Sequence, residues 1–104
     1  MKSKMRPVHP GEVLNEEYLL PLSLSANQLA QALHVPANRI SGIVAGKRAI
    51  TADTALRLAR VFRTSPQFWM NLQQMYELRV AELEAKRDVA AIRPIVTLGR
   101  EARV

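Results

Sequence analysis

The apolar residues of this 104-residue chain recur three and four positions apart along most of its length, and almost no stretch alternates between apolar and polar residues. The first spacing is that of a helix with one buried face, whereas alternation is the pattern of a half-buried strand. Ser, Thr and Pro stand where these helical stretches begin, and Gly or Pro where several end. The sequence therefore predicts an all-α domain of five helices, over about 10–20, 26–33, 36–45, 51–62 and 66–85.

The two ends of the chain are less regular. Residues 1–7 carry three cations and are predicted to form a flexible basic arm, and residues 86–104 a C-terminal tail. Within that tail, residues 92–99 contain a short β-prone run with Pro94 in it, so this segment is either tail or an edge strand. We therefore divide the chain into the arm, a central domain over 8–85 and the tail.

Composition excludes several classes of protein. The chain has no cysteine, which removes disulfides, thiolate catalysis, zinc–thiolate clusters and iron–sulfur ligation. No apolar run approaches the roughly 18 residues that a membrane-spanning helix needs, and the basic start lacks the apolar stretch of a secretory signal. We expect a soluble, cytoplasmic protein with no membrane partner.

Positive charge is concentrated in one part of the sequence. The net charge is +6, from 15 lysines and arginines against 9 aspartates and glutamates. In residues 36–63, six cations face a single anion, Asp53. Such a stretch in a small domain favours a polyanionic partner, nucleic acid first. Basic ribosomal and membrane-surface proteins share this composition, so charge alone does not decide.

Residues 26–43 have the spacing of a helix-turn-helix. The small residue Ala30 stands where two helices must approach closely, and Val35 follows in the turn, where it can fill the space between them. Ile40 and Ile43 then fix the next helix to the core. This arrangement leaves the outer face of that helix free to enter a DNA major groove.

Two positions depart from the usual motif. His34 stands where glycine is common because the backbone there tends to positive φ, a region that histidine tolerates better than most residues. Pro36 replaces the Ser or Thr that commonly caps the reading helix, although proline is accepted at a first helical position.

The outer face of the reading helix supplies the predicted base contacts. Arginine can bind a guanine edge and asparagine an adenine edge in bidentate fashion, so we predict that Arg39 and Asn38 read bases. Gly42 has no side chain to hold the helix away from the bases. The predicted base-reading set is Ala37, Asn38, Arg39, Ser41 and Gly42. The alternative is that these residues form only a solvated helix face.

Predicted phosphate contacts flank the reading helix. Backbone amides and short polar side chains at the start of the second helix suit one phosphate, and the basic loop 46–50 and the start of the fourth helix suit another. These residues are Ser25, Asn27, Gln28, Lys47, Arg48 and Thr51. The fourth helix is predicted to pack through Ala52, Ala55, Leu56, Ala59 and Phe62.

Four blocks, over residues 9–14, 26–43, 46–59 and 65–73, occur in the order found in one known family. Together they resemble the HigA-type antitoxins, within the broader phage-repressor-like (Xre) helix-turn-helix family, over about residues 8–85. The resemblance implies an antitoxin of a type II toxin–antitoxin pair that neutralises a HigB/RelE-like mRNA endonuclease toxin. It also implies a dimer that binds double-stranded operator DNA and represses its own operon, with the reading helix on 36–45.

Three alternatives to this function stay open. The first is a stand-alone Xre-type transcriptional repressor without a toxin partner, which a neighbouring gene for a small, basic, RelE-like protein would argue against. The second is a protein-binding module that has lost DNA binding. The third is a non-specific RNA-binding protein, against which the scarcity of exposed aromatic residues argues.

The fifth helix holds most of the aromatic residues. They close the core over the first and fourth helices, form a two-fold dimer contact, or do both. We predict a homodimer, which would place two reading helices about 34 Å, one DNA turn, apart on a palindromic operator. The predicted interface residues are Leu72, Met75, Tyr76 and Leu83.

Nothing in the sequence indicates an enzyme or a cofactor. His9 and His34 are the only imidazoles, and neither shares a helix with a carboxylate or second histidine at the i+3 or i+4 spacing of metal ligands, so we predict no metal site. His9 is expected to cap the first helix beside Pro10. There is no Gly-rich phosphate cradle, no Ser-His-Asp set and no recognisable nucleophile.

Glu12, Glu16 and Glu17 form an acidic group on the first helix. We interpret them as a solvated face, favoured near a helix N-terminus. The alternatives are paired acid and base carboxylates or a contact with a basic toxin.

Overall fold

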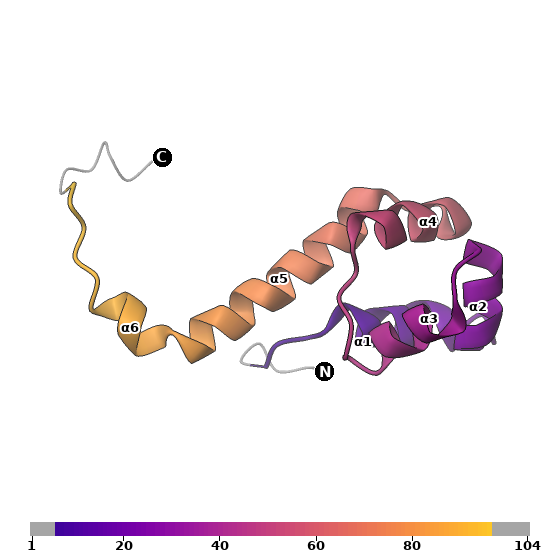
Figure 1. Ribbon diagram of the computed structural model, residues 1–104, viewed down its shortest axis with the longest axis horizontal. Coiled ribbons are helices and arrows are strands. Elements are labelled where there is room, and N and C mark those ends of the chain that lie inside the picture. Colours follow the sequence, from indigo (N-terminus) through magenta and orange to yellow (C-terminus); the bar gives the residue numbers. More distant parts are fainter. Residues whose placement is uncertain (1–5, 97–104) are drawn as a thin grey trace.

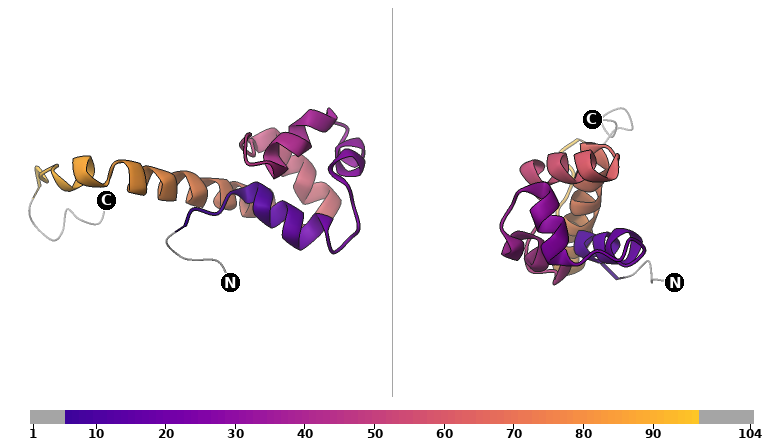
Figure 2. Two further views of the ribbon diagram at one scale, coloured as in Figure 1. Left: turned by 90° about the horizontal axis from the view of Figure 1, so that it is seen from below. Right: turned by 90° about the vertical axis from the view of Figure 1, so that its right-hand side faces the viewer.

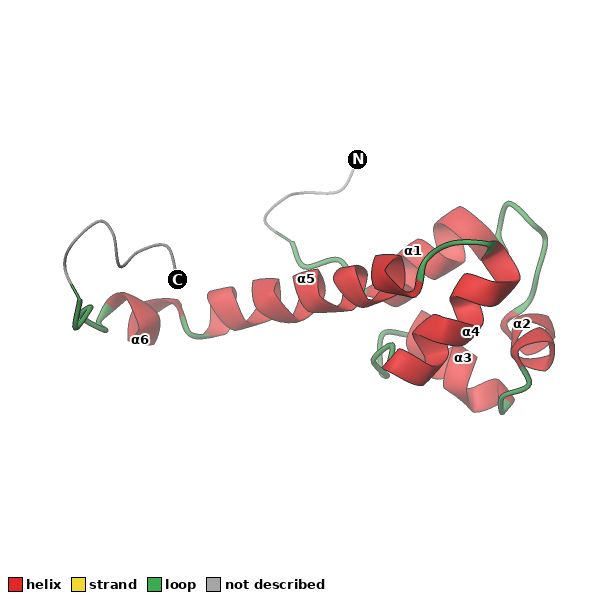
Figure 3. Cartoon of the chain, turned by 90° about the horizontal axis from the view of Figure 1, so that it is seen from above, coloured by secondary structure: helices red, strands yellow, loops and turns green. Residues whose placement is uncertain are grey.

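The computed structural model describes residues 6–96, and within them every regular element is helical (Figures 1 and 3). The five predicted helices are present, and a sixth lies in the predicted tail. In chain order the elements are α1 (Pro10–Leu14), a π-helical turn η1 (Asn15–Leu19), α2 (Ala26–Leu33), α3 (Ala37–Val44), α4 (Ala52–Phe62), α5 (Pro66–Glu84) and α6 (Lys86–Ala90). The all-α prediction is confirmed.

The elements from α1 to α4 and the beginning of α5 pack together, whereas the rest of α5 extends away from them toward α6 (Figures 1 and 2). With 19 residues at about 1.5 Å per residue, α5 is about 28 Å long. The far part of this helix therefore presents most of its circumference to solvent.

Side-chain caps start four of the helices where the sequence predicts them. The Ser25 hydroxyl accepts a hydrogen bond from the Gln28 amide at 3.0 Å, and the Gln28 side chain accepts one from the Ser25 amide at 2.9 Å, which forms a capping box. Thr51 and Ser65 cap α4 and α5 through their hydroxyls, which accept from the Thr54 and Phe68 amides. His9 caps α1, as expected, because its Nδ1 accepts from the Gly11 amide at 2.9 Å.

The core is formed by side chains of α1, η1, α2, α3, α4, the loop before α4 and the beginning of α5. Its largest fully buried side chain is Trp69. The buried apolar residues are Leu14, Leu19, Leu29, Ala30, Leu33, Ile40, Ile43, Ile50, Ala55, Leu58, Ala59 and Trp69.

Two residues of the predicted packing face of α4 are not buried. Leu56 is 60% exposed, whereas Leu58 is fully buried. At about 100° per residue, Leu58 shares the inner face of α4 with Ala55 and Ala59, whereas Leu56 is turned about 100° away from the centre of that face. Ala52, at the first position of the helix, is also exposed.

The first five residues of the predicted tail form the helix α6. Ala85 has φ −106° and ψ 15°, which ends α5 before α6 starts at Lys86. Residues 92–96 form no strand. The remainder of the possible edge strand, residues 97–99, and residues 1–5 of the predicted arm lie outside the described residues.

Candidate nucleic-acid interface

A left-handed residue sets the turn between α2 and α3. His34 has φ 60° and ψ 46° and forms the C-cap of α2, as its position in the motif predicts. The Val35 amide then donates to the Ala30 carbonyl at 3.0 Å, and the half-buried Val35 side chain packs against the core. This turn directs the chain into α3. Ile40 and Ile43 anchor α3 in the core, because both side chains are fully buried.

The outer face of α3 is accessible. Ala37, Asn38 and Ser41 are exposed, and Arg39 and Gly42 are half-buried. The five predicted base-reading residues therefore lie on a helix whose opposite face is anchored in the core. Pro36 is the N-cap of α3 and makes no side-chain capping bond, so this N-terminus lacks the Ser or Thr cap that the motif commonly carries.

Arg39 is held by an ion pair to the start of α4. Its Nη1 lies 2.6 Å from Oδ2 of Asp53, and Nε of Arg57 lies 3.0 Å from the same oxygen. Arg57 also donates to the Leu33 carbonyl at 2.8 Å. Hydrogen bonds from Arg57 and then Arg39 lower the pKa of the Asp53 carboxyl below its ordinary value, although burial opposes this. Asp53 was absent from the predicted site.

Gly42 has a further role beside the one predicted. A Cβ placed on Gly42 would lie 2.4 Å from Cδ and 2.7 Å from Cγ of Arg48. The missing side chain thus leaves room for the aliphatic part of Arg48 to cross α3. The contact links the reading helix to the basic loop that follows it.

The basic loop 46–50 turns tightly and is anchored at its far end. Gly46 has φ 76°, and the amides of Lys47 and Arg48 both donate to the Gly42 carbonyl, at 2.9 and 3.1 Å. Both side chains are exposed. Ile50 is buried, and its amide donates to Oε1 of Gln73 at 2.8 Å. Sequence reasoning missed Gln73, since a glutamine in an amphipathic helix gives no signal of burial.

At the predicted phosphate sites the polar groups have structural partners as well. The capping box already uses the amides and side-chain oxygens of Ser25 and Gln28, while the Asn27 side chain is exposed. The Thr51 hydroxyl accepts from the Thr54 amide at 3.4 Å. Asn27, Lys47 and Arg48 are therefore the predicted phosphate-binding residues whose side chains have no capping bond.

The start of α1 touches both α3 and α5. A Cβ on Gly11 would lie only 1.8 Å from the Ile43 carbonyl oxygen, so α1 packs directly on the backbone of α3. The His9 ring meets Tyr76 of α5 edge-on, with centroids 4.8 Å apart. Burial lowers the pKa of the His9 imidazole below its ordinary value, against the opposing effect of a hydrogen bond with the backbone of Arg48. No sequence pattern identified Gly11 as a contact residue.

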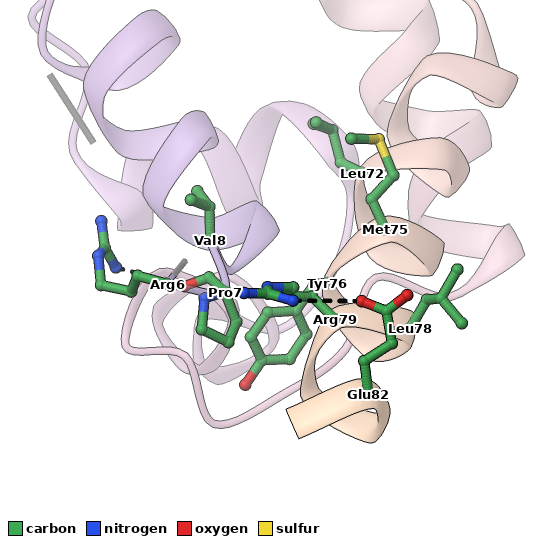
Figure 4. Close-up of a pocket in the computed structure, with 9 residues that line it drawn as sticks. All are labelled: Arg6, Pro7, Val8, Leu72, Met75, Tyr76, Leu78, Arg79 and Glu82. Carbon is green, nitrogen blue, oxygen red and sulfur yellow. Dashed lines mark hydrogen bonds and ion pairs between the residues drawn. The ribbon is translucent and has the colours of Figure 1, made fainter. Parts of the chain in front are cut away.

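A groove lies between the N-terminal segment and the middle of α5 (Figure 4). It contains three of the four predicted dimer residues, Leu72, Met75 and Tyr76, together with Leu78 and residues 6–8. The fourth, Leu83, lies apart from this groove, beside charged residues at the α5–α6 junction. Leu83 is 46% exposed.

The acidic residues of the first helical segment differ in surroundings. Glu12 forms an ion pair with Arg6, with Nη2 and Oε2 2.9 Å apart. Glu16 and Glu17 belong to η1 and are exposed. Across the described residues, no three His, Cys, Asp or Glu side chains gather as metal ligands would. None of the helices described is both long and apolar enough to cross a membrane.

Comparisons with known proteins agree with this geometry. The helix-turn-helix family model matches residues 16–69. The chain is 50% identical over 102 residues to virulence-associated protein I of Dichelobacter nodosus, covering 98% of this chain and 91% of that protein. It is 33% identical over 103 residues to antitoxin HigA-1 of Vibrio cholerae serotype O1, covering 98% and 97%.

A solved structure shares most of this fold. The Pseudomonas aeruginosa antitoxin HigA with the higBA promoter superposes with a TM-score of 0.84 at 44% identity, over 88% of this chain and 100% of that one. The helix α2, the left-handed turn and the anchored α3 define a helix-turn-helix protein. The chain belongs to the Xre-like helix-turn-helix family, and HigA-type antitoxins are its structural neighbours, which confirms the resemblance found in the sequence.

Proposed function

We propose that this chain is the antitoxin of a type II toxin–antitoxin pair, which binds its operator as a dimer, represses its own operon and neutralises a HigB/RelE-like mRNA endonuclease. The accessible outer face of α3 carries the DNA-binding part of this proposal. The HigA antitoxin structure that contains promoter DNA supports it, because it covers nearly the same residues at 44% identity. We assign these functions to residues 8–85.

On this proposal α3 enters the major groove. Asn38 and Arg39 read base edges, with Ala37, Ser41 and Gly42 close to the bases. Lys47 and Arg48 bind phosphates on one side of the groove, because both are exposed directly after α3. The remaining predicted phosphate contacts are those of Ser25, Asn27, Gln28 and Thr51, at the starts of α2 and α4.

Replacing Arg39 and Lys47 separately tests this division of roles. Arg39→Ala should lower operator affinity roughly 10- to 100-fold and relax base preference at one position per half-site, because a bidentate base contact is lost. Lys47→Ala should weaken operator and random DNA alike and flatten the slope of log K against log salt by about one unit. Gel shifts or fluorescence anisotropy at several salt concentrations measure both. Equal losses on operator and random duplexes for both variants would contradict the assignment.

The groove on α5 supports the dimer. Met75 and Leu78 are 67% and 63% exposed, and they lie beside Leu72 and Tyr76 (Figure 4). Exposed apolar side chains that adjoin one another commonly mark an interface. A two-fold axis near this groove would relate the two α3 helices by symmetry, as a palindromic operator requires.

Met75→Glu is expected to convert the dimer to a monomer, because the variant buries a carboxylate against apolar residues of the partner. Multi-angle light scattering over a range of concentrations measures the mass, and operator affinity should fall at the same time. Leu22→Glu is the matched control. Leu22 is also a large, exposed apolar residue, but it lies in the turn before α2. A wild-type protein that is monomeric at every concentration would contradict the dimer, as would a Met75→Glu protein that stays dimeric.

Two observations support the toxin-binding part of the proposal: the antitoxin relatives, and the exposed acidic side chains of η1. Glu16 and Glu17 offer negative charge that a basic toxin could meet. Co-expression with the adjacent gene product is the direct test: growth should be rescued and a complex should co-purify. Operator binding without rescue or complex formation would leave a stand-alone repressor.

A further inference from the structure

Asp53 is the one carboxylate in the basic stretch 36–63, and it lies between two guanidinium groups. Its Oδ2 accepts from Nη1 of Arg39 on α3 at 2.6 Å and from Nε of Arg57 on α4 at 3.0 Å. Both partners contact the same oxygen atom. The carboxylate therefore joins the reading helix to the first turn of α4.

The far end of this network reaches the turn of the motif. Nη1 of Arg57 donates to the carbonyls of Leu33 and His34, at 2.8 and 3.4 Å. Arg57 is thus fixed by the C-terminus of α2, and it in turn holds Asp53 four residues earlier on its own helix. Asp53 approaches Arg39 from a position set by α2 and α4 rather than by α3.

This contact leaves most of the Arg39 side chain available. A guanidinium has five N–H donors, and the bond to Asp53 uses one of them. The donors that remain include an Nη pair or an Nη–Nε edge of the kind that binds both acceptors of a guanine. The Arg39 side chain is 30% exposed, so part of it is open to solvent on the outer face of α3.

A carboxylate beside a DNA-binding face carries an energetic cost, because it repels phosphates at every sequence. It can still favour the correct sequence if it restricts the guanidinium to the orientation that reads the base, since less freedom is then lost on binding. Affinity for random DNA and preference for the operator would therefore depend on Asp53 in opposite directions.

The geometry points to Asp53 as a specificity-determining positioning residue, which orients the Arg39 guanidinium toward a guanine edge in the operator. This inference rests on the proposed DNA-binding function. It assigns to Asp53 a role in selecting sequence and to Arg57 the task of holding Asp53.

Asp53→Asn tests the inference, because it keeps the shape of the side chain and removes its charge. The probes are a duplex with the region upstream of the chain's own coding sequence and a random-sequence duplex of the same length. The ratio of the two affinities should fall about tenfold, with random-duplex binding unchanged or tighter. In a library of single-base operator variants, the lost preference should fall on the base pair that Arg39→Ala also affects.

Three further variants separate positioning from folding. Asp53→Glu keeps the carboxylate and should recover part of the ratio, whereas Asp53→Asn combined with Arg39→Ala should lose no more specificity than Arg39→Ala alone. Asp88→Asn makes the same change at an exposed position on α6 and should leave the ratio unchanged. Melting temperatures of all variants report any loss of fold.

Two outcomes would overturn the inference while leaving DNA binding intact. One is that Asp53→Asn changes both duplex affinities by the same factor and preserves the base preferences. The other is that Arg39→Ala preserves base preference, so that there is no reading residue for Asp53 to position. Failure of the wild-type protein to bind the upstream duplex more tightly than the random one would instead refute the proposed function itself.

Discussion

Trp69→Ala is expected to lower the free energy of unfolding by about 3–5 kcal/mol, the range seen when a large buried aromatic side chain is truncated. The indole is fully buried. Its ring lies 5.1 Å from that of Tyr18, 4.9 Å from that of Phe68 and 6.3 Å from that of Phe62, centroid to centroid. Its Nε1 donates to the Thr64 hydroxyl at 2.8 Å. The side chain thus joins η1, α4 and α5.

Urea denaturation followed by circular dichroism, at a fixed protein concentration, measures this loss. Small domains commonly have only about 5–15 kcal/mol of stability in total, so Trp69→Ala should be mostly unfolded at moderate denaturant. Trp69→Phe is the matched control, because it keeps most of the apolar volume and gives up the bond to Thr64, worth about 1 kcal/mol. A loss below about 1 kcal/mol for Trp69→Ala would show that the cluster does not hold the core together.

Gly11→Ala is expected to destabilise the protein by about 3 kcal/mol or more, above the common range for an added core methyl group. The new Cβ would fall 1.8 Å from the Ile43 carbonyl oxygen and 3.0 Å from the Val44 Cα. These are backbone atoms of α3 and cannot rotate away. α1 would have to separate from α3, which disturbs the helix proposed to read DNA.

Gly42→Ala is the matched comparison for Gly11→Ala. Both variants exchange glycine for a residue with higher helix propensity, a gain of at most about 1 kcal/mol. At Gly42, however, the added Cβ meets only the flexible side chain of Arg48, which can move. Gly42→Ala should therefore change the midpoint of thermal unfolding little. Similar stability for the two variants, measured by calorimetry, would contradict the close packing of α1 on α3.

Local chemistry explains why most of the fold was predictable. Ser25, Thr51 and Ser65 each stand before a helix and cap it through a hydroxyl, and such caps depend on residues three positions away at most. The left-handed His34 followed from the motif in the same local manner. The error at Leu56 arose because α4 has apolar residues on two faces, and spacing alone does not show which face is buried.

Contacts between distant residues explain what the sequence did not reveal. The bond from Ile50 to Gln73 spans 23 positions, and that from Arg39 to Asp53 spans 14. Neither follows from helical periodicity, because each depends on how two elements are placed against one another. The same holds for Gly11, whose close approach to Ile43 appears only when α1 and α3 are packed. The roles of the predicted DNA-reading and dimer residues stay predictions.

The projecting part of α5 has a geometric consequence. An α-helix advances about 1.5 Å and turns about 100° with each residue. Because α5 runs without interruption from Pro66 to Glu84, the distance and azimuth from the domain to any position on its far half are set by residue count alone. Inserting a single residue after Gln73 would rotate all later residues of the helix by about 100° around its axis. Length variation is thus far less tolerable inside this helix than in the surface loops.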